Sequence, residues 1–508
     1  MNDHITEIPQ SEGVFGRYMR ENRLLNSLLV SLSMIVGIVG VMLAWTIVLP
    51  VGVETGSDFG DAGAPAQQQQ QEKQKVVKLM QRQKKAQPKT QQTFRTTAIS
   101  DITIPDFNEL EVKDLAPVIE ASAPTMSTAS SSNQAMKSAL KGINLSMPKV
   151  MQQRCDPKKR TERLKSGGGK EMTEKAIIKG LTWLKTMQDE DGGWGLKDEG
   201  KVYGGGVLHR DAMSGMAILS LLGHCELQDS PEFGPTVKRG IDFLASSPPD
   251  KLAIYSQSGK FEGLNGKSHQ GGAYSHAIRT YALCEAYTMT KIPKLKEYAI
   301  RATKIIVDGQ HPNGGWAYKY GLGAGAHVDL SISGWCIQAL KAAALTGITE
   351  IDGIDDAMDK AVEYVKKCQD GSGMFKYMPE KHGGHSSRGS LTGTGVLSLQ
   401  IWKNAKSEEA KIGLEYIIAN RLHDEWSKVD VYEWYYHAQA CFQSTGVLSS
   451  RYWRAWNKSF QSVVVGAQEE DGKWSHGLHF HGDSDMFCTT LSILMLEVYY
   501  RFAPMSKV

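Results

Sequence analysis

The sequence has almost no charge imbalance and few cysteines, and both shortages exclude classes of protein. It contains 58 Lys and Arg against 55 Asp and Glu, a net charge of +3 at pH 7. Binding to nucleic acid normally leaves a clear basic excess, so we expect no nucleic-acid partner. The seven cysteines are never spaced as Cys-x-x-Cys, which argues against a zinc ribbon and against a scaffold built on disulfides.

Glycine is scarce in the first third of the chain and abundant afterwards. Nine of the 51 glycines precede residue 167 and 42 stand at or after it, so the overall share is about a tenth against a usual ~7%. No Gly-x-y period is present, which excludes a collagen-like rod. The aromatic residues, with 11 Trp, 18 Tyr and 13 Phe, indicate that the glycine-rich part is a folded domain.

A long uncharged run near the start predicts a membrane anchor. Residues 24–53 contain no charged side chain, and about 20 apolar residues suffice to cross a bilayer as a helix. Three arginines precede the run and three acidic residues follow it: Arg17, Arg20, Arg23, Glu54, Asp58 and Asp61. The positive-inside rule then places residues 1–23 in the cytoplasm and the rest beyond the inner (cytoplasmic) membrane, in the periplasm. The run is too long for the apolar part of a cleaved signal peptide, so we expect an uncleaved, single-pass signal anchor.

We interpret residues 54–150 as a disordered tether. Residues 67–92 are rich in glutamine and lysine, residues 101–120 are acidic, and a Ser/Ala-rich stretch runs to Ser132. None of these stretches has an apolar period that would bury a core.

From about residue 155 to 505, one short pattern returns four times. A glutamine stands six residues before an aromatic residue, with glycine between them, as in Gln-Asp-Glu-Asp-Gly-Gly-Trp. We expect the glutamine to cap the preceding helix, the glycines to form the turn, and the aromatic ring to pack between helix pairs. The four pairs are Gln188 and Trp194, Gln310 and Trp316, Gln369 and Phe375, and Gln468 and Trp474.

Helical stretches of two kinds alternate around these copies. One kind has a single apolar stripe, as a helix covering a core requires, and the other is apolar nearly all round, as a buried helix requires. The first kind starts near residues 172, 237, 296, 355, 407 and 451, and the second near 211, 275, 329, 390, 432 and 485. Two concentric rings of helices best bury the apolar faces of six such pairs. We therefore predict an all-α (α/α)6 toroid over 155–505, preceded by one transmembrane helix and a disordered linker.

The repeats resemble the QW repeats of squalene–hopene and oxidosqualene cyclases, which protein prenyltransferase β subunits share. Stretches such as VDLSISGWCIQALKAA (328–343) and TTLSILMLEVYYRF (489–502) resemble the membrane-anchored prenyltransferase/squalene-oxidase-repeat proteins of Planctomycetes and Verrucomicrobia. The resemblance implies a terpenoid-cyclase-type toroid and isoprenoid chemistry.

The N-terminal ends of the inner helices of such a toroid meet at one opening of the ring, where their dipoles favour acidic groups. The candidate catalytic residues at these ends are Asp211, His276, Asp329 and Asp485. The candidate ligand-binding residues are His209, His327, His481, Trp335, Trp434 and Tyr436. For the three aspartates, a role as helix N-caps is the competing interpretation.

The motifs of the resembled enzymes are incomplete here. The D-x-D-D-T-A motif of squalene–hopene-type cyclases aligns with Asp485-Met-Phe-Cys-Thr-Thr, which keeps the first acid but lacks the proton donor. The zinc ligands of protein prenyltransferases align with Asp329, Ser331 and Cys488, and serine is a poor zinc ligand. A zinc set of Asp329, Cys488 and a histidine, His327 or His481, is the remaining metal candidate. The sequence thus assigns no cofactor and leaves open whether the protein is an enzyme.

Three functions follow as hypotheses. The first is a membrane-anchored envelope protein whose toroid binds or acts on an isoprenoid or other apolar ligand in its central cavity. The second is a non-catalytic scaffold or binding module for an envelope protein or a glycan. The third is a metal-assisted hydrolase or lyase that uses histidines and aspartates at the ring opening.

Overall fold

The computed structural model describes residues 147–197, 209–249, 253–258, 260–264, 272–379, 389–446, 448–475 and 484–502. The predicted cytoplasmic segment 1–23, the anchor 24–53 and nearly all of the tether 54–150 lie outside these residues. Within them, none of the helices combines the length and the apolarity that a membrane crossing requires.

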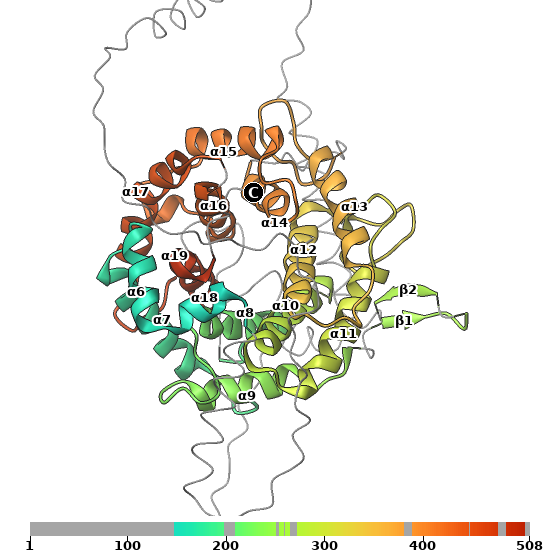
Figure 1. Cartoon of the computed structure of the whole chain (residues 1–508), viewed down its shortest axis with the longest axis horizontal. Helices are drawn as coiled ribbons and strands as arrows, with labels where there is room; N and C mark the ends of the chain where they lie inside the picture. The colour runs from blue at the N-terminus through green and yellow to red at the C-terminus, as the bar shows by residue number, and fades with distance from the viewer. Residues whose placement is uncertain are drawn as a thin grey trace, which may run out of the picture. The chain divides into compact units, whose positions relative to one another are not determined.

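The described part of the chain forms two concentric rings of helices (Figure 1). The outer ring consists of α7 (Glu171–Met187), α9 (Gly234–Leu244), α11 (Pro293–Asp308), α13 (Ile354–Lys367), α15 (Glu408–Asn420) and α17 (Ser450–Gly466). The inner ring consists of α8 (Arg210–Gly223), α10 (Gly272–Thr290), α12 (Leu330–Leu345), α14 (Thr392–Ile401), α16 (Val431–Gln443) and α18 (Asp485–Leu496). The predicted toroid, with six helices of each kind starting near the expected residues, is confirmed.

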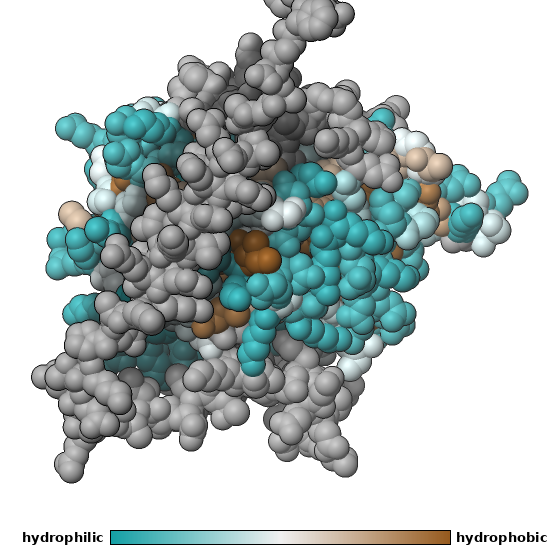
Figure 2. Space-filling view, turned by 90° about the horizontal axis from the view of Figure 1, so that it is seen from above, coloured by the Kyte–Doolittle hydropathy of each residue, from teal (hydrophilic) through white to brown (hydrophobic). Residues whose placement is uncertain are grey.

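Both rings close on themselves. Each inner helix contacts the next one along the chain, and the last, α18, contacts the first, α8. In the outer ring α17 contacts α7. The outer helices turn their polar faces to solvent, and the described surface in Figure 2 is accordingly mostly hydrophilic.

Small elements outside the two rings complete the domain. Two short antiparallel hairpins pair β1 (Ala253–Tyr255) with β2 (Phe261–Leu264) and β3 (Trp316–Ala317) with β4 (Val328–Asp329). The helices α5 (Lys149–Cys155) and α6 (Pro157–Ser166) contact the terminal helix α19 (Val498–Arg501). Two short 3-10 helices, η4 (Trp426–Lys428) and η5 (Ser444–Gly446), flank α16. The all-α prediction missed both hairpins.

The repeat glutamines link neighbouring outer helices. Each donates one hydrogen bond to a glycine carbonyl in its own turn and another to a carbonyl of the next outer helix. Gln188 is the C-cap residue of α7, as expected, whereas the other three glutamines do not occupy the C-cap of the preceding helix. The second bonds are Gln188 to Thr236 at 3.0 Å, Gln310 to Ala357 at 2.7 Å, Gln369 to Glu409 at 2.9 Å and Gln468 to Ala176 at 2.8 Å. The last of these joins the end of the repeat array to α7 and so helps close the ring.

The aromatic residue of each copy is bonded to the inner ring. Its backbone N–H donates to a serine or threonine hydroxyl of the following inner helix: Ser214, Ser333, Thr392 and Thr489. Trp194, Trp316, Phe375 and Trp474 are fully buried. These rings are therefore part of the core between the two rings of helices.

The turn glycines are required by both conformation and space. Gly192 and Gly472 have φ angles of 92° and 103°, a region that side chains other than glycine rarely adopt. A Cβ on Gly472 would lie 2.4 Å from the carbonyl oxygen of Lys179 in α7. Glycine therefore lets each turn touch the neighbouring outer helix.

Candidate functional site

Asp329 lies at the junction of β4 and α12, beneath one opening of the inner ring. Its side chain is completely buried. The carboxylate oxygen Oδ1 accepts the backbone N–H of Ile332 at 3.0 Å and so caps α12, as the N-cap interpretation predicted.

The other carboxylate oxygen of Asp329, Oδ2, faces His327. It is buried, forms no hydrogen bond of ordinary length to a described residue, and pairs with Nε2 of His327 at 3.9 Å. Burial raises the pKa of Asp329 to about 7, and hydrogen bonds from Ile332, Tyr377 and Ser331 offset only part of that effect. Asp329 is thus a carboxyl group that exchanges its proton near neutral pH.

Three tyrosines and a histidine lie near Asp329, and a fourth tyrosine, Tyr318, contacts several of them. We call these six residues the tyrosine mouth: Tyr274, Tyr318, His327, Asp329, Tyr377 and Tyr432. Burial raises the pKa of the Tyr274, Tyr377 and Tyr432 hydroxyls, and the Asp329 carboxylate raises it further. These phenols therefore stay protonated near neutral pH.

The rings of the tyrosine mouth contact one another. The Tyr318 and Tyr377 hydroxyl oxygens are 2.6 Å apart. The Tyr318 ring centroid lies 5.8 Å from that of Tyr274 and 5.4 Å from that of His327. Tyr274, Tyr318 and Tyr377 are half-buried and the His327 side chain is 44% exposed, so the mouth is partly open to solvent.

Below the tyrosine mouth, side chains of α12 and α16 meet across the interior of the ring. These helices are separated by α14, so contacts between them span the interior. Tyr435 donates to Oε1 of Gln338 at 3.1 Å, Gln338 donates to the Tyr436 hydroxyl at 3.2 Å, and Trp335 stacks on Tyr435. None of these four side chains is more than 4% exposed. Two predicted ligand-binding residues, Trp335 and Tyr436, thus fill this interior.

The opposite end of the inner ring carries a buried ion-pair network. Glu285 accepts from Arg154 of α5 at 2.7 Å and from Arg501 of α19 at 3.0 Å. Arg501 also lies 3.2 Å from Glu497, whose pKa is raised to about 8 because burial outweighs the nearby positive charges. The network anchors α5 and α19 at this end.

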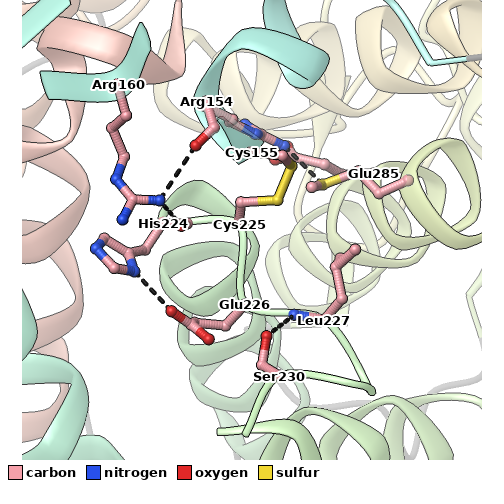
Figure 3. Close-up of a disulfide and its surroundings, with 10 residues drawn as sticks. Arg154, Cys155, Arg160, His224, Cys225, Glu226, Leu227, Ser230 and Glu285 are labelled. Atoms are coloured by element: carbon pink, nitrogen blue, oxygen red, sulfur yellow. Dashed lines mark hydrogen bonds and ion pairs between the residues drawn. A yellow bond between two sulfur atoms is a disulfide. The ribbon is translucent and has the colours of Figure 1, made fainter. Parts of the chain in front are cut away.

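A disulfide between Cys155 and Cys225 lies beside this network (Figure 3). It ties the end of α5 to the turn after α8. Arg160 of α6 donates to the His224 carbonyl at 2.9 Å, and the His224 ring contacts Glu226 at 2.8 Å. The sequence left the state of the seven cysteines open, and the other five are buried thiols.

Three of the four predicted catalytic residues have partners outside the tyrosine mouth. Asp211 pairs with Arg279 at 3.0 Å, and Asp485 pairs with Lys473 at 2.8 Å. His276 is 3.1 Å from the Tyr320 hydroxyl, and burial together with Arg279 lowers its pKa to about 3, so its ring is neutral. Only Asp329 of these candidates lies in the mouth.

The remaining predicted residues are dispersed. His327 belongs to the tyrosine mouth, whereas Trp434 packs between the rings, 5.0 Å from Trp456 of α17. His209 precedes α8 and burial lowers its pKa. His481 lies outside the described residues.

The metal prediction gains no support from the described ranges. They contain no group of three or more His, Cys, Asp or Glu side chains placed to hold a metal ion. Asp329 starts α12, whereas Cys488 lies on α18, whose inner-ring neighbours are α16 and α8.

The site residues predicted from the sequence do not include the four tyrosines, although Tyr318 and Tyr377 carry a signal. Tyr318 and Tyr377 each stand two residues after a repeat aromatic, Trp316 and Phe375. The corresponding positions in the other copies hold Leu196 and His476. The difference between copies marks the side of the toroid where the mouth lies.

Comparisons with known proteins give only distant structural likenesses. No protein family model matches the sequence, and no curated protein matches it. An α-1,6-mannanase from Salegentibacter sp. HEL1_6 is similar over 65% of this chain and 99% of its own, with 10% identity and a TM-score of 0.47. A type II terpene cyclase from Scytonema is similar over 65% of this chain and 98% of its own, with 10% identity and a TM-score of 0.42. Neither likeness is close enough to bear on the function of this chain.

Proposed function

We propose that this chain is a membrane-anchored envelope protein whose toroid binds an isoprenoid or another apolar ligand at the tyrosine mouth. The observation that carries the proposal is a buried carboxyl group, Asp329, with a pKa near neutral pH beneath four tyrosines. The resemblance of the repeats to the membrane-anchored prenyltransferase/squalene-oxidase-repeat group supports the ligand class. The anchor at 24–53 is a prediction from the sequence.

Each part of the tyrosine mouth has a chemical task on this proposal. The phenol rings offer apolar area at little conformational cost, and their hydroxyls orient a polar group of the ligand. Asp329 both accepts and donates a proton readily near pH 7, which suits a general acid or base. It is the group that we propose for any proton transfer at the site.

The interior contacts favour a ligand position at the opening of the ring. The sequence predicted a ligand in a central cavity, but Trp335, Gln338, Tyr435 and Tyr436 pack against one another there. At the far end Glu285 is held by two arginines. We therefore place the ligand against the tyrosine mouth.

The disulfide supports export of the toroid. Disulfides persist in oxidising compartments and are rare in the cytosol. A bond between Cys155 and Cys225 agrees with the proposed topology, in which residues 1–23 are cytoplasmic and the toroid is periplasmic.

Lipid retention tests the proposal. The purified full-length chain is incubated with bacterial lipid extract, washed, and analysed by mass spectrometry. We expect the wild type to retain an isoprenoid and Tyr377→Leu to retain much less, because that ring and its bond to Tyr318 are lost. Tyr255→Leu, at an exposed tyrosine on β1, is the control and should behave as wild type. No retained lipid, or equal retention by Tyr377→Leu, would overturn the proposal.

A scaffold or binding module for an envelope protein or a glycan is the second candidate. It is favoured because Asp211, Asp485 and His276 bind other residues of the fold. Only one of the four predicted catalytic side chains, Asp329, therefore lies in the tyrosine mouth. Crosslinking in envelope fractions should then return one reproducible partner, and its absence would count against this candidate.

A further inference from the structure

Two elements of the toroid carry a surplus of basic residues. Residues 157–170, which include α6, contain six Lys and Arg and one acidic residue, and α17 contains three Lys and Arg and no acidic residue. These two segments have a net charge of +8 in a chain whose net charge is +3. The surplus of positive charge is therefore local.

α6 and α17 are in contact, so their basic residues form one surface. Trp453 and Asn457 of α17 donate hydrogen bonds to the carbonyls of Gly167 and Gly168, at the end of α6, at 2.7 and 3.3 Å. The two helices are neighbours in Figure 1. We call five exposed cations of these segments the basic face: Lys158, Lys165, Lys170, Arg454 and Lys458.

The positive charge of the basic face is not balanced by its own elements. None of its five cations forms an ion pair with a described residue, and Glu162 is the one acidic residue of the two segments. Each of the other outer helices pairs a cation with an acid of the same helix: Lys175 with Glu171, Lys238 with Asp242, Lys304 with Asp308, Lys366 with Glu363 and Lys411 with Glu408. The outer helix α17 differs in having no acidic residue, so it favours an anionic partner.

A groove beside Lys458 adds apolar surface to the basic face. Its volume is about 300 Å³, and its apolar lining comes from Leu422, Ala455 and Val463. Leu422 is 36% exposed. Asp424 also lines the groove, where its carboxylate lies 3.4 Å from the ammonium group of Lys428.

A second exposed apolar side chain lies next to Lys170 in the chain. Met172, in the first turn of α7, is 53% exposed. Cations beside exposed apolar side chains suit a phospholipid surface, which offers phosphate groups and acyl chains together. A soluble polyanion would contact the cations alone.

We propose that the basic face docks the toroid on an anionic phospholipid surface, with lipid phosphate groups beside Lys165, Arg454 and Lys458. The inference rests on the proposed function only in taking the chain as membrane-anchored, and it adds the side of the toroid that faces the membrane. α6 starts at Pro157, soon after the end of the tether predicted at 54–150. The basic face thus belongs to the part of the toroid that follows the predicted anchor and tether in the chain.

Lysine acetylation of the full-length chain in vesicles tests the docking. The vesicles contain phosphatidylcholine alone or together with phosphatidylglycerol, and mass spectrometry measures the labelling rate of each lysine. We expect Lys165 and Lys458 to react at least about tenfold more slowly with phosphatidylglycerol present, because several cations together bind an anionic surface strongly. Salt at 1 M should remove the difference, since it shortens the screening length to about 3 Å. Lys294 and Lys360, exposed on α11 and α13, are internal controls and should react equally in both kinds of vesicle.

Paired variants separate the basic face from charge in general. Arg454→Gln with Lys458→Gln should restore fast labelling of Lys165 in phosphatidylglycerol vesicles. Lys294→Gln with Lys360→Gln removes two positive charges elsewhere on the toroid and should leave the labelling of Lys165 slow. Thermal melting of both double variants checks that they fold.

Equal labelling rates of Lys165 and Lys458 in the two kinds of vesicle would overturn the inference. Equally fast rates would mean an uncovered face, and equally slow rates a face covered by something other than lipid, such as the acidic residues 101–120 of this chain. Alkaline extraction of the same vesicles tests the anchor separately. Equal rates in a chain that resists extraction would leave the proposed function standing, whereas extraction of a chain with salt-sensitive protection would remove the anchor and keep the basic face.

Discussion

At the scale of single residues, the two oxygens of Asp329 have different roles. Oδ1 holds the start of α12 through Ile332, whereas Oδ2 is buried and lies 3.9 Å from Nε2 of His327. Capping by one oxygen fixes the carboxyl group in place, and this fixed position keeps the second oxygen out of water. A single N-cap aspartate, Asp329, can thus have both a structural and a chemical role.

The sequence shows only the first of these roles. An aspartate before an apolar helix predicts a cap, and Asp329 was therefore expected at the ring opening. The contact between the hydroxyls of Tyr318 and Tyr377 joins residues 59 positions apart. No local pattern predicts such a contact, because it depends on how the second and third repeat turns approach each other.

The raised pKa of Asp329 predicts a pH-dependent stability. Between the ordinary value for aspartate and about 7, the folded state binds more protons than the unfolded state, so this group's stabilising contribution is lost as the pH rises. Asp329→Asn should therefore gain in free energy of unfolding relative to wild type, by up to a few kcal/mol, from about pH 4 to about pH 8. Urea unfolding of both proteins across this range measures the difference. A difference that does not change with pH would contradict the assignment.

At the scale of elements, the repeat turn is the unit that builds the toroid. The same glutamine bonds, the same buried aromatic position and the same hydroxyl acceptor recur in all four copies. Periodicity alone predicted the number and kind of helices. The acceptors of the glutamine hydrogen bonds could not be predicted from the sequence, because they are backbone carbonyls on the next outer helix.

Removal of a repeat glutamine should destabilise the fold. In Gln468→Ala the carbonyls of Ala176 and Gly472 each lose one hydrogen bond, and each such bond contributes about 0.5–1.5 kcal/mol. Chemical denaturation measures the loss. Gln257→Ala, at an exposed position of the β1–β2 hairpin, is the control and should be neutral, and equal stability of the two variants would show that the link is unimportant.

At the scale of the whole molecule, the two ends of the inner ring differ. One end carries the partly open tyrosine mouth, and the other is held by Arg154, Arg501, Glu285 and the nearby disulfide. Residues from the start and the end of the described chain meet at this second end. The glycine excess and the helical periods predicted a toroid, but not this closure, because it joins distant parts of the chain.

The disulfide makes three measurable predictions. Alkylation of the denatured chain without reductant should modify five cysteines, and with reductant all seven. A double variant, Cys155→Ser with Cys225→Ser, should lose about 2–5 kcal/mol of stability, since the bond closes a long loop. Its melting temperature should no longer respond to reductant. Seven reactive thiols in protein isolated under oxidising conditions would contradict the pairing.

The central claim, that ligands bind at the tyrosine mouth, is tested most directly by photo-crosslinking. The full-length chain is irradiated with an isoprenoid alcohol that carries a diazirine, and the labelled peptides are mapped by mass spectrometry. We predict labels in the peptides that contain Tyr318, His327 and Tyr377, with competition by unlabelled isoprenoid. Labels confined to other surfaces of the toroid, or labels in the mouth that unlabelled isoprenoid does not displace, would contradict the claim.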